Sequence, residues 1–158
     1  MQEDIHQQPC TDSSYIHIGG GSSLWRYKMI ELTTQKIVEI HDLIIKKFGG
    51  TRGVLYSATI EHLVYKLNRK TDVFDKASLT LYSIITEHPF YDGNKRTAFQ
   101  IADLLLRDER YHIHSNDEET LRFLLRIAEY KCQFEKINMW LKKNTRFQPQ
   151  ETHQLQLE

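Results

Sequence analysis

The chain has 158 residues, of which 40% are hydrophobic, and this is enough for one domain with a sizeable core. Its 21 basic and 21 acidic residues balance, with a pI near 7.1, so the composition lacks the basic excess that favours direct nucleic-acid binding. Two cysteines, no apolar run of membrane-spanning length and no signal peptide exclude a disulfide scaffold and a transmembrane protein, and we expect a cytoplasmic location.

The two ends of the chain differ in composition from its middle. Residues 1–28 are polar at the start, contain Gly19-Gly-Gly-Ser-Ser23 and show little periodicity, which predicts a flexible tail or extension. Residues 147–158 are polar and rich in glutamine, which predicts a second tail. We therefore expect one domain over residues 29–146.

Between the tails, apolar residues recur at helical spacing in six segments. They are Ile37, Ile40, Ile44, Ile45 and Phe48; Ile60, Leu63, Val64 and Leu67; Leu81, Ile84 and Ile85; Ile101, Leu104 and Leu105; Leu121, Leu124, Leu125 and Ala128; and Ile137, Trp140 and Leu141. Ser115-Asn-Asp-Glu118 has the pattern of a capping box before the fifth segment. The spacing predicts an all-α fold, a single helical bundle without internal repeats.

An irregular excursion is expected after the first helix. Gly49-Gly-Thr-Arg-Gly-Val-Leu55 contains paired glycines, which end helices and permit left-handed backbone. Arg52 lies within this excursion, and taken by itself it would be a solvated loop arginine.

The segment His88-Pro-Phe-Tyr-Asp-Gly-Asn-Lys-Arg-Thr-Ala98 joins the third and fourth helical segments. Its polar residues therefore occupy a helix-to-helix turn, and Gly93 suits the tightest point of that turn. If Asn94 starts the next helix, the free N–H groups of the first turn point into the loop, where they attract anions.

The side chains of this loop suit phosphate chemistry. The planar fork of Arg96 matches phosphate oxygens, and the ammonium of Lys95 is a compact point charge. Asp92 supplies a hard oxygen ligand for Mg²⁺, which takes its other ligands from water and substrate phosphates. The imidazole of His88 can accept a proton from an attacking hydroxyl at physiological pH. Together they predict metal-assisted transfer of a phosphate-bearing group to a hydroxyl.

Each of these residues also has a simpler interpretation. A single histidine at a helix end is favoured by the helix dipole, and aspartate and asparagine are common in turns and caps. Single lysines and arginines are usually surface charges, and the combination within one short loop is what favours a functional site. His41, His62, His112 and His114 lack metal-ligand spacing, so we expect them to be structural or exposed.

The segment from His88 to Arg96 resembles the signature of the Fic/Doc family, His-Pro-Phe-x-[Asp/Glu]-Gly-Asn-[Gly/Lys]-Arg, and every fixed position is matched. The similarity covers about residues 30–144. It includes the segment 32–50 and Gly53-Val-Leu-Tyr-Ser-Ala, which are similar to the opening of Doc-type proteins.

The resemblance implies a role for each matching residue. His88 corresponds to the general base and Asp92 to the Mg²⁺ ligand. The phosphates of the co-substrate ATP would be held by Gly93, Asn94, Lys95 and Arg96. These assignments are what the family pattern implies.

Two further parts of the family pattern are expected here. Phe90 corresponds to the buried anchor that fixes the loop. A flap that aligns the target's backbone lies near this loop in Fic/Doc proteins, and Arg52 and Gly53 are the candidates for it.

The eighth signature position separates two chemistries. AMP-transferring Fic enzymes carry glycine there, whereas Doc proteins carry lysine, as Lys95 does here, which implies that the terminal phosphate of ATP faces the base. Phe99 replaces a second arginine of the AMP-transferring relatives, in agreement with phosphorylation. However, the founding Doc type has alanine in place of Gly93 and lacks the proline found here as Pro89. AMP transfer is therefore the alternative, followed by a non-catalytic nucleotide- or protein-binding module.

The resemblance also implies protein partners. The modified hydroxyl would belong to a target protein, by resemblance a translation elongation factor. Some Fic proteins carry an inhibitory helix, but Ser57-Ala-Thr-Ile-Glu-His62 matches its motif incompletely. Restraint by a separate antitoxin protein is therefore expected, with the chain as the toxin of a toxin-antitoxin pair.

Overall fold

The computed structural model describes residues 31–149, so the predicted tail at 1–28 and residues 150–158 lie outside the described residues. This part of the chain forms six helices and two short strands. In chain order they are α1 (Thr34–Phe48), α2 (Ser57–Leu67), α3 (Val73–Glu87), α4 (Asn94–Asp108), β1 (Tyr111–Ile113), α5 (Asp117–Ala128), α6 (Phe134–Lys143) and β2 (Thr145–Phe147). The predicted all-α class is confirmed, with a small sheet that the spacing did not predict.

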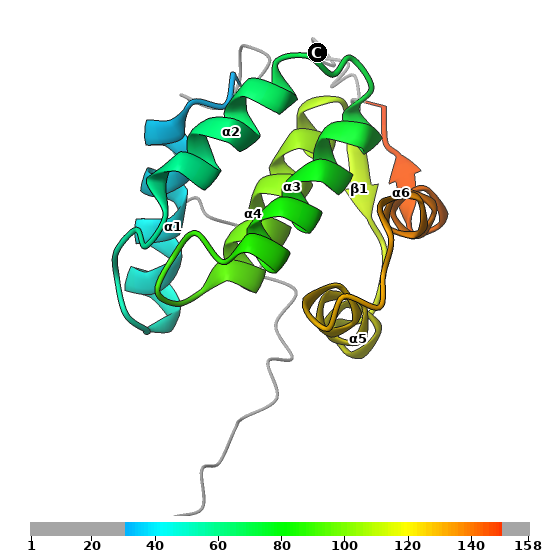
Figure 1. Ribbon diagram of the computed structural model, residues 1–158. Helices are drawn as coiled ribbons and strands as arrows, with labels where there is room; N and C mark the ends of the chain where they lie inside the picture. The colour runs from blue at the N-terminus through cyan, green and yellow to red at the C-terminus, as the bar shows by residue number, and fades with distance from the viewer. Residues whose placement is uncertain (1–30, 150–158) are drawn as a thin grey trace, which may run out of the picture.

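Helices α3 and α4 form the centre of the bundle (Figure 1), where they pack extensively along each other. Helix α3 also contacts α2, α5 and α6, and α4 contacts α1 and β1. Because neighbours cover these two helices on several sides, apolar side chains such as Leu81, Ile84, Ile101 and Leu106 are fully buried. The loop between α3 and α4 is thus anchored at both ends in the core.

Helix α1 shows how local sequence sets its ends and its buried face. The Thr33 hydroxyl accepts a hydrogen bond from the Lys36 N–H at 3.1 Å and caps the first turn. The buried residues of α1 share one face of the helix: they are Ile37, Ile40, His41, Ile44 and Ile45. The helix ends at Gly49, whose φ of 81° is readily adopted by glycine.

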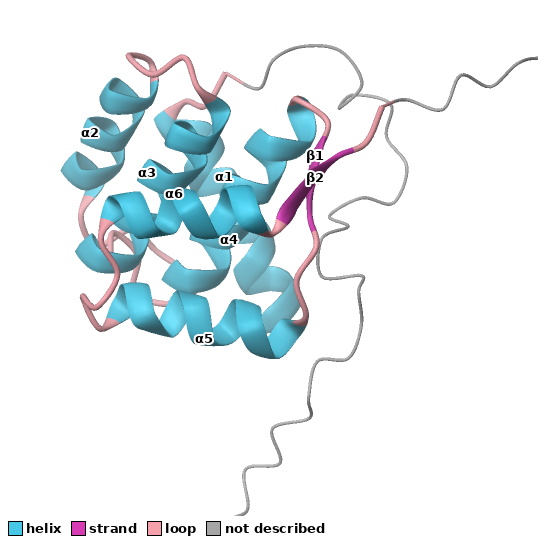
Figure 2. Ribbon diagram, turned by 90° about the vertical axis from the view of Figure 1, so that its right-hand side faces the viewer, coloured by secondary structure: helices cyan, strands magenta, loops and turns pink. Residues whose placement is uncertain are grey.

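The two strands pair in an antiparallel sheet beside the helices (Figure 2), with Tyr111 opposite Phe147 and Ile113 opposite Thr145. The rings of Tyr111 and Phe147 meet edge to face at 5.5 Å. Phe147, the first residue of the predicted C-terminal tail, is thus the last residue of β2. Each strand has only three residues, too few to show an alternating pattern in the sequence.

The cap of α5 falls one residue later than the capping-box pattern predicted. Asn116, rather than Ser115, is the cap, and its side chain accepts from the Glu119 N–H at 2.8 Å. The Ser115 hydroxyl instead bonds to the hydroxyl of Thr120. Asparagine and serine are about equally good caps, so the pattern alone could not choose between adjacent residues.

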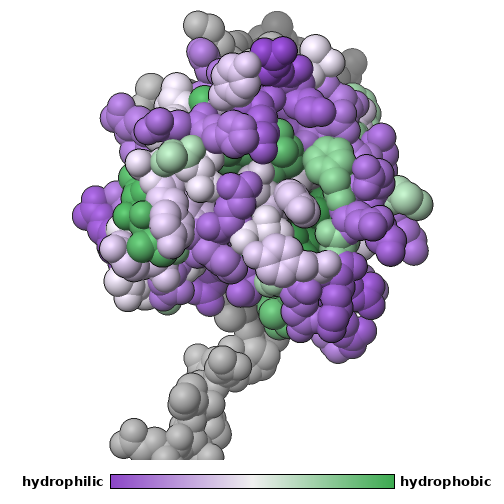
Figure 3. Space-filling view, in the orientation of Figure 1, coloured by the Kyte–Doolittle hydropathy of each residue, from purple (hydrophilic) through white to green (hydrophobic). Residues whose placement is uncertain are grey.

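The face seen in Figure 3 is mainly hydrophilic, with smaller hydrophobic areas between the polar side chains. Within residues 31–149, no helix combines the length and hydrophobicity that crossing a membrane requires. The apolar faces of the helices form one buried core.

Truncation of a buried leucine tests the packing of the central pair. Leu81→Ala should lower the free energy of unfolding by about 2–5 kcal/mol, because the removed side chain is fully buried in α3. Leu121→Ala is the matched control, since Leu121 is exposed on α5, and it should change stability by less than about 0.5 kcal/mol. Urea denaturation measures both values, and similar losses for the two variants would contradict this packing.

Candidate active site

The loop begins where α3 ends, at His88. This residue caps α3 in a left-handed conformation, with φ 46° and ψ 61°. Such backbone costs a non-glycine residue about 1–3 kcal/mol and is found mainly where surrounding contacts enforce it. The following Pro89 also disfavours helical backbone at His88. The His88 side chain is exposed at this turn, whereas Pro89 is buried.

The Asn94 side chain closes the loop on itself. Its Oδ1 accepts from the Phe90 N–H at 3.0 Å, and its Nδ2 donates to the Phe90 carbonyl at 2.9 Å. The Phe90 ring is almost fully buried, at 1% exposure. Asn94 is the first residue of α4, as predicted, and Gly93 before it is left-handed with φ 73°. The amide of Asn94 is therefore used within the loop.

The Asp92 carboxylate is exposed beside the glycines that follow α1. Its Oδ1 accepts from the Gly93 N–H at 2.6 Å, and its Oδ2 accepts from the Thr51 N–H at 3.3 Å. A Cβ added at Gly50 would lie 2.5 Å from Oδ2, so the backbone there approaches as closely as glycine allows. The carboxylate is thus held by backbone groups from two segments.

The donor set around Asp92 fits Mg²⁺ better than a metal that requires a full protein cage. Within residues 31–149, no three His, Cys, Asp or Glu side chains gather to hold a metal ion. Mg²⁺ is commonly bound through one or two carboxylates, with water and substrate phosphates completing its shell. One exposed carboxylate at Asp92 meets that requirement.

Both cations of the motif belong to the first turn of α4. Lys95 is half-buried, and the exposed Arg96 holds its guanidinium 4.8 Å from the centre of the Phe48 ring at the end of α1. Gly93, the N-cap of α4, has no side chain with which to bond the first N–H groups of the helix. Free N–H groups and two cations therefore share one helix end, an arrangement that attracts phosphate.

Residues 49–56 contain both flap candidates and are called the flap segment below; they lie against the loop between α3 and α4, called the motif loop. Val54 forms a β-bridge with Phe90, and the Tyr91 N–H donates to the Gly53 carbonyl at 3.2 Å. The Leu55 N–H donates to the Pro89 carbonyl at 2.7 Å. The structure thus places the backbone of Gly53 in contact with the motif loop.

Arg52, the other flap candidate, contacts α1 instead of the loop. Its Nη2 donates to Oδ2 of Asp42 at 2.6 Å, while most of its side chain is exposed. This hydrogen bond lowers the pKa of the Asp42 carboxyl below its ordinary value, with burial acting in the opposite direction. The same bond raises the pKa of Arg52. Arg52 therefore links the flap segment to α1 through an exposed ion pair.

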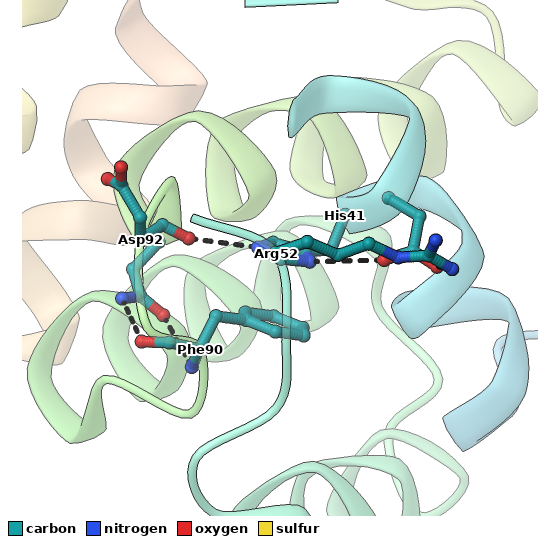
Figure 4. Close-up of polar contacts among 6 residues, drawn as sticks. His41, Arg52, Phe90 and Asp92 are labelled. Atoms are coloured by element: carbon teal, nitrogen blue, oxygen red, sulfur yellow. Dashed lines mark hydrogen bonds and ion pairs between the residues drawn. The ribbon is translucent and has the colours of Figure 1, made fainter. Parts of the chain in front are cut away.

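A histidine to which the sequence assigned no role at the site contacts the loop directly (Figure 4). The His41 ring is fully buried and stacks on the Phe90 ring, with centroids 3.8 Å apart and an interplanar angle of 4°. Its Nε2 lies 2.9 Å from the Asp92 carbonyl oxygen. The available signal was its position next to Ile40 and three residues before Ile44, within the apolar stripe of α1.

Residues 31–106 match the model of the Fic/DOC family. The matched segment belongs to the Fic/Doc family. The chain is also similar to a protein of Escherichia phage P1 described as "Protein kinase doc", with 26% identity over 96 residues, covering 57% of this chain and 76% of that protein. The resemblance expected from the loop is thereby confirmed. Fic/Doc proteins are usually enzymatic transferases, and they generally use ATP.

Replacing Gly50 tests the support of the Asp92 carboxylate. Gly50→Ala should displace it, because the new Cβ would lie 2.5 Å from Oδ2. Gly49→Ala is the matched control, since Gly49 also has positive φ but an added Cβ meets no atom within 4 Å. Backbone strain should cost each variant roughly 1 kcal/mol or more, but only Gly50→Ala should shift the NMR amide signal of Gly93, which is bonded to the Asp92 carboxylate. Equal shifts in both variants would argue against this contact.

Proposed function

We propose that this chain is an ATP-dependent transferase that phosphorylates a hydroxyl group of a target protein. The observation that supports it most is the complete Fic/Doc signature, which occupies the loop between α3 and α4 and the first turn of α4. The imidazole of His88, the carboxylate of Asp92 and the cations Lys95 and Arg96 all belong to this loop and the first turn of α4.

In the proposed reaction, the acceptor hydroxyl loses its proton to His88. The hydroxyl oxygen then bonds to the terminal phosphorus of ATP, while the bond from that phosphorus to the bridging oxygen breaks and ADP leaves. The exposure of His88 suits this role, because the acceptor comes from another protein. Mg²⁺ held by Asp92 would supply positive charge that offsets the negative charge of the phosphates.

The phosphates would be held at the start of α4. Arg96 and Lys95 would contribute their charges, and Gly93 would contribute close backbone approach. Asn94 would act through its backbone N–H, because its side-chain amide is already bonded to Phe90. This assignment separates the loop-closing role of Asn94 from its contact with the nucleotide.

Lys95 supports phosphorylation over AMP transfer. In Doc-type proteins a lysine at this position crowds the anion site, so that ATP presents its terminal phosphate to the base. AMP transfer is the second candidate, because Pro89 and Gly93 follow the Fic pattern. A non-catalytic binding module comes third, since the loop retains its full set of polar residues.

The similarity to the phage kinase suggests that the substrate is a protein. By the same resemblance, we propose that the target is a translation elongation factor and that a separate antitoxin restrains the activity. An antitoxin segment that folds on binding would lose its conformational entropy at that step.

A labelling experiment tests the proposed function. The purified chain is incubated with Mg²⁺, a cell lysate and ATP radiolabelled at either the α or the γ phosphate. Incorporation of the γ label alone, above that in lysate without the chain, supports phosphorylation, whereas the α label requires AMP transfer, because the reactions cleave different phosphate bonds. Mass spectrometry separates them as gains of about 80 Da and about 329 Da. Absence of both label and ATP binding in folded protein would favour the binding module.

Removal of the proposed base should separate chemistry from binding. His88→Ala should reduce transfer by on the order of 100- to 10,000-fold, while ATP affinity measured by calorimetry stays within a few-fold of wild type. The base acts on the acceptor and makes no required contact with the phosphates. His62→Ala, at an exposed histidine of α2, is the control and should leave transfer unchanged. A parallel loss of ATP binding in His88→Ala would contradict the assigned role.

A change at Lys95 should alter which phosphate is transferred. Lys95→Gly should widen the anion site and increase incorporation of the α label relative to the γ label. Lys36→Gly is the control, because Lys36 is also a half-buried lysine in the first turn of a helix. An unchanged product ratio in folded Lys95→Gly would show that Lys95 does not select the phosphate.

A further inference from the structure

The buried face of α1 reaches the motif loop through one polar side chain, His41. Its Nε2 lies 2.9 Å from the Asp92 carbonyl oxygen, which can only accept a hydrogen bond. Nε2 must therefore carry the ring proton and donate it. The ring is fully buried, so this bond replaces one that the carbonyl and the ring would otherwise make with water.

The other ring nitrogen indicates the same tautomer. Nδ1 of His41 is buried and has no hydrogen-bond partner among the described residues, and the nearest carboxylate oxygen of Asp42 is 3.7 Å away. A proton on Nδ1 would leave a buried N–H group unpaired, which costs free energy. With the single proton on Nε2, Nδ1 carries only a lone pair and leaves no N–H group unpaired.

The two contacts of His41 hold different parts of the loop. The His41 ring packs against the buried ring of Phe90, whereas its Nε2–H donates a hydrogen bond to the backbone carbonyl of Asp92. Asp92 itself is exposed, and its carboxylate is otherwise bonded to the backbone N–H groups of Gly93 and Thr51. Because the carbonyl and the carboxylate belong to one residue, fixing the carbonyl limits the directions in which the carboxylate can point.

A further contact connects this histidine with the flap segment. Asp42, the next residue of α1, is bonded to Arg52 at 2.6 Å. Figure 4 shows Arg52 reaching α1 while His41 reaches the Asp92 carbonyl. Asp42 contacts the flap segment and His41 contacts the motif loop, so two adjacent residues of α1 position both segments relative to the same helix.

We propose that His41 is a positioning residue that orients Asp92 for Mg²⁺ through the Nε2 hydrogen bond to the Asp92 carbonyl. This inference rests on the proposed function, in which Asp92 binds Mg²⁺ with ATP. Groups that orient a metal ligand from behind typically change metal affinity by about 10- to 100-fold when they are removed. His41 makes no contact of its own with the metal or the nucleotide in this role.

Two substitutions separate the donor from the ring. His41→Phe keeps an aromatic ring to stack on Phe90 but removes the Nε2 donor, and the carbonyl of Asp92 loses its partner. His41→Gln keeps an amide donor at a similar distance from the backbone but removes the stacked ring. His62→Phe is the control for placing phenylalanine at a histidine position, because His62 is exposed on α2.

The measurement is calorimetric titration of ATP into each full-length variant with and without Mg²⁺. In His41→Phe, the increase in ATP affinity caused by Mg²⁺ should fall roughly 10-fold or more, while the affinity without Mg²⁺ stays close to wild type. The melting temperature should fall by only a few degrees, because the Asp92 carbonyl loses one hydrogen bond. His41→Gln should be less stable but should retain more of the Mg²⁺ effect. His62→Phe should match wild type.

The outcomes distinguish this inference from the function on which it rests. Wild-type protein that binds no nucleotide would overturn the proposed function and, with it, the purpose assigned to His41. If wild-type protein binds ATP but the Mg²⁺ effect is unchanged in His41→Phe, the positioning role alone is overturned. The same holds if His41→Gln loses as much of the Mg²⁺ effect as His41→Phe does. NMR of the histidine ring nitrogens in unliganded protein gives an independent check: a proton on Nδ1 instead of Nε2 would refute the donor geometry.

Discussion

Burial of the Phe90 ring, together with the two hydrogen bonds between its backbone and the Asn94 side chain, holds the motif loop in one shape. The chain leaves α3 at His88, enters the core at Phe90 and returns to the surface before Asn94 starts α4. Because both ends of this excursion are fixed, the residues between them cannot rearrange independently. His88 and Asp92 are exposed side chains on a loop whose backbone is anchored, which is how a rigid scaffold presents chemical groups.

The local electrostatics of the loop differ from those of the chain as a whole. The chain has no net charge, yet Lys95, Arg96 and the free N–H groups of α4 share one helix end. The helix dipole adds positive potential at the same place. Attraction of a phosphate therefore depends on the alignment of a few groups. A neutral composition that disfavours extended nucleic-acid binding is compatible with a compact phosphate site.

Contacts from distant segments complete the loop. The flap segment bonds to the backbone of Pro89 and Tyr91, and His41 of α1 bonds to the Asp92 carbonyl. The Asp42–Arg52 ion pair connects α1 with the flap segment. A displacement of the flap segment or of α1 would therefore reach Asp92 through defined contacts. The geometry of the candidate site thus depends on the packing of α1, α3 and α4 as much as on the motif.

Much of the local structure could be predicted because its causes are local. The apolar spacing predicted the helices, the paired glycines predicted the end of α1, and the motif predicted the turn at Gly93 and the helix start at Asn94. The family could be inferred from residue types alone, because the signature lies within one continuous segment. The roles proposed for the motif residues follow from that resemblance and from their chemistry.

Long-range contacts could not be predicted in the same way. His41 and Asp92 are 51 positions apart, and nothing in either neighbourhood indicates that they meet. The pairing of β1 with β2 and the turn of Arg52 toward Asp42 likewise depend on how the helices pack. The sequence alone thus determined the helices, the loop and the chemical groups that the loop carries. Their causes act over a few residues: the spacing of apolar residues, the backbone freedom of glycine and the type of each side chain. Only the tertiary structure determined which distant side chains support that loop, because those contacts form only when α1, α3 and α4 have packed together.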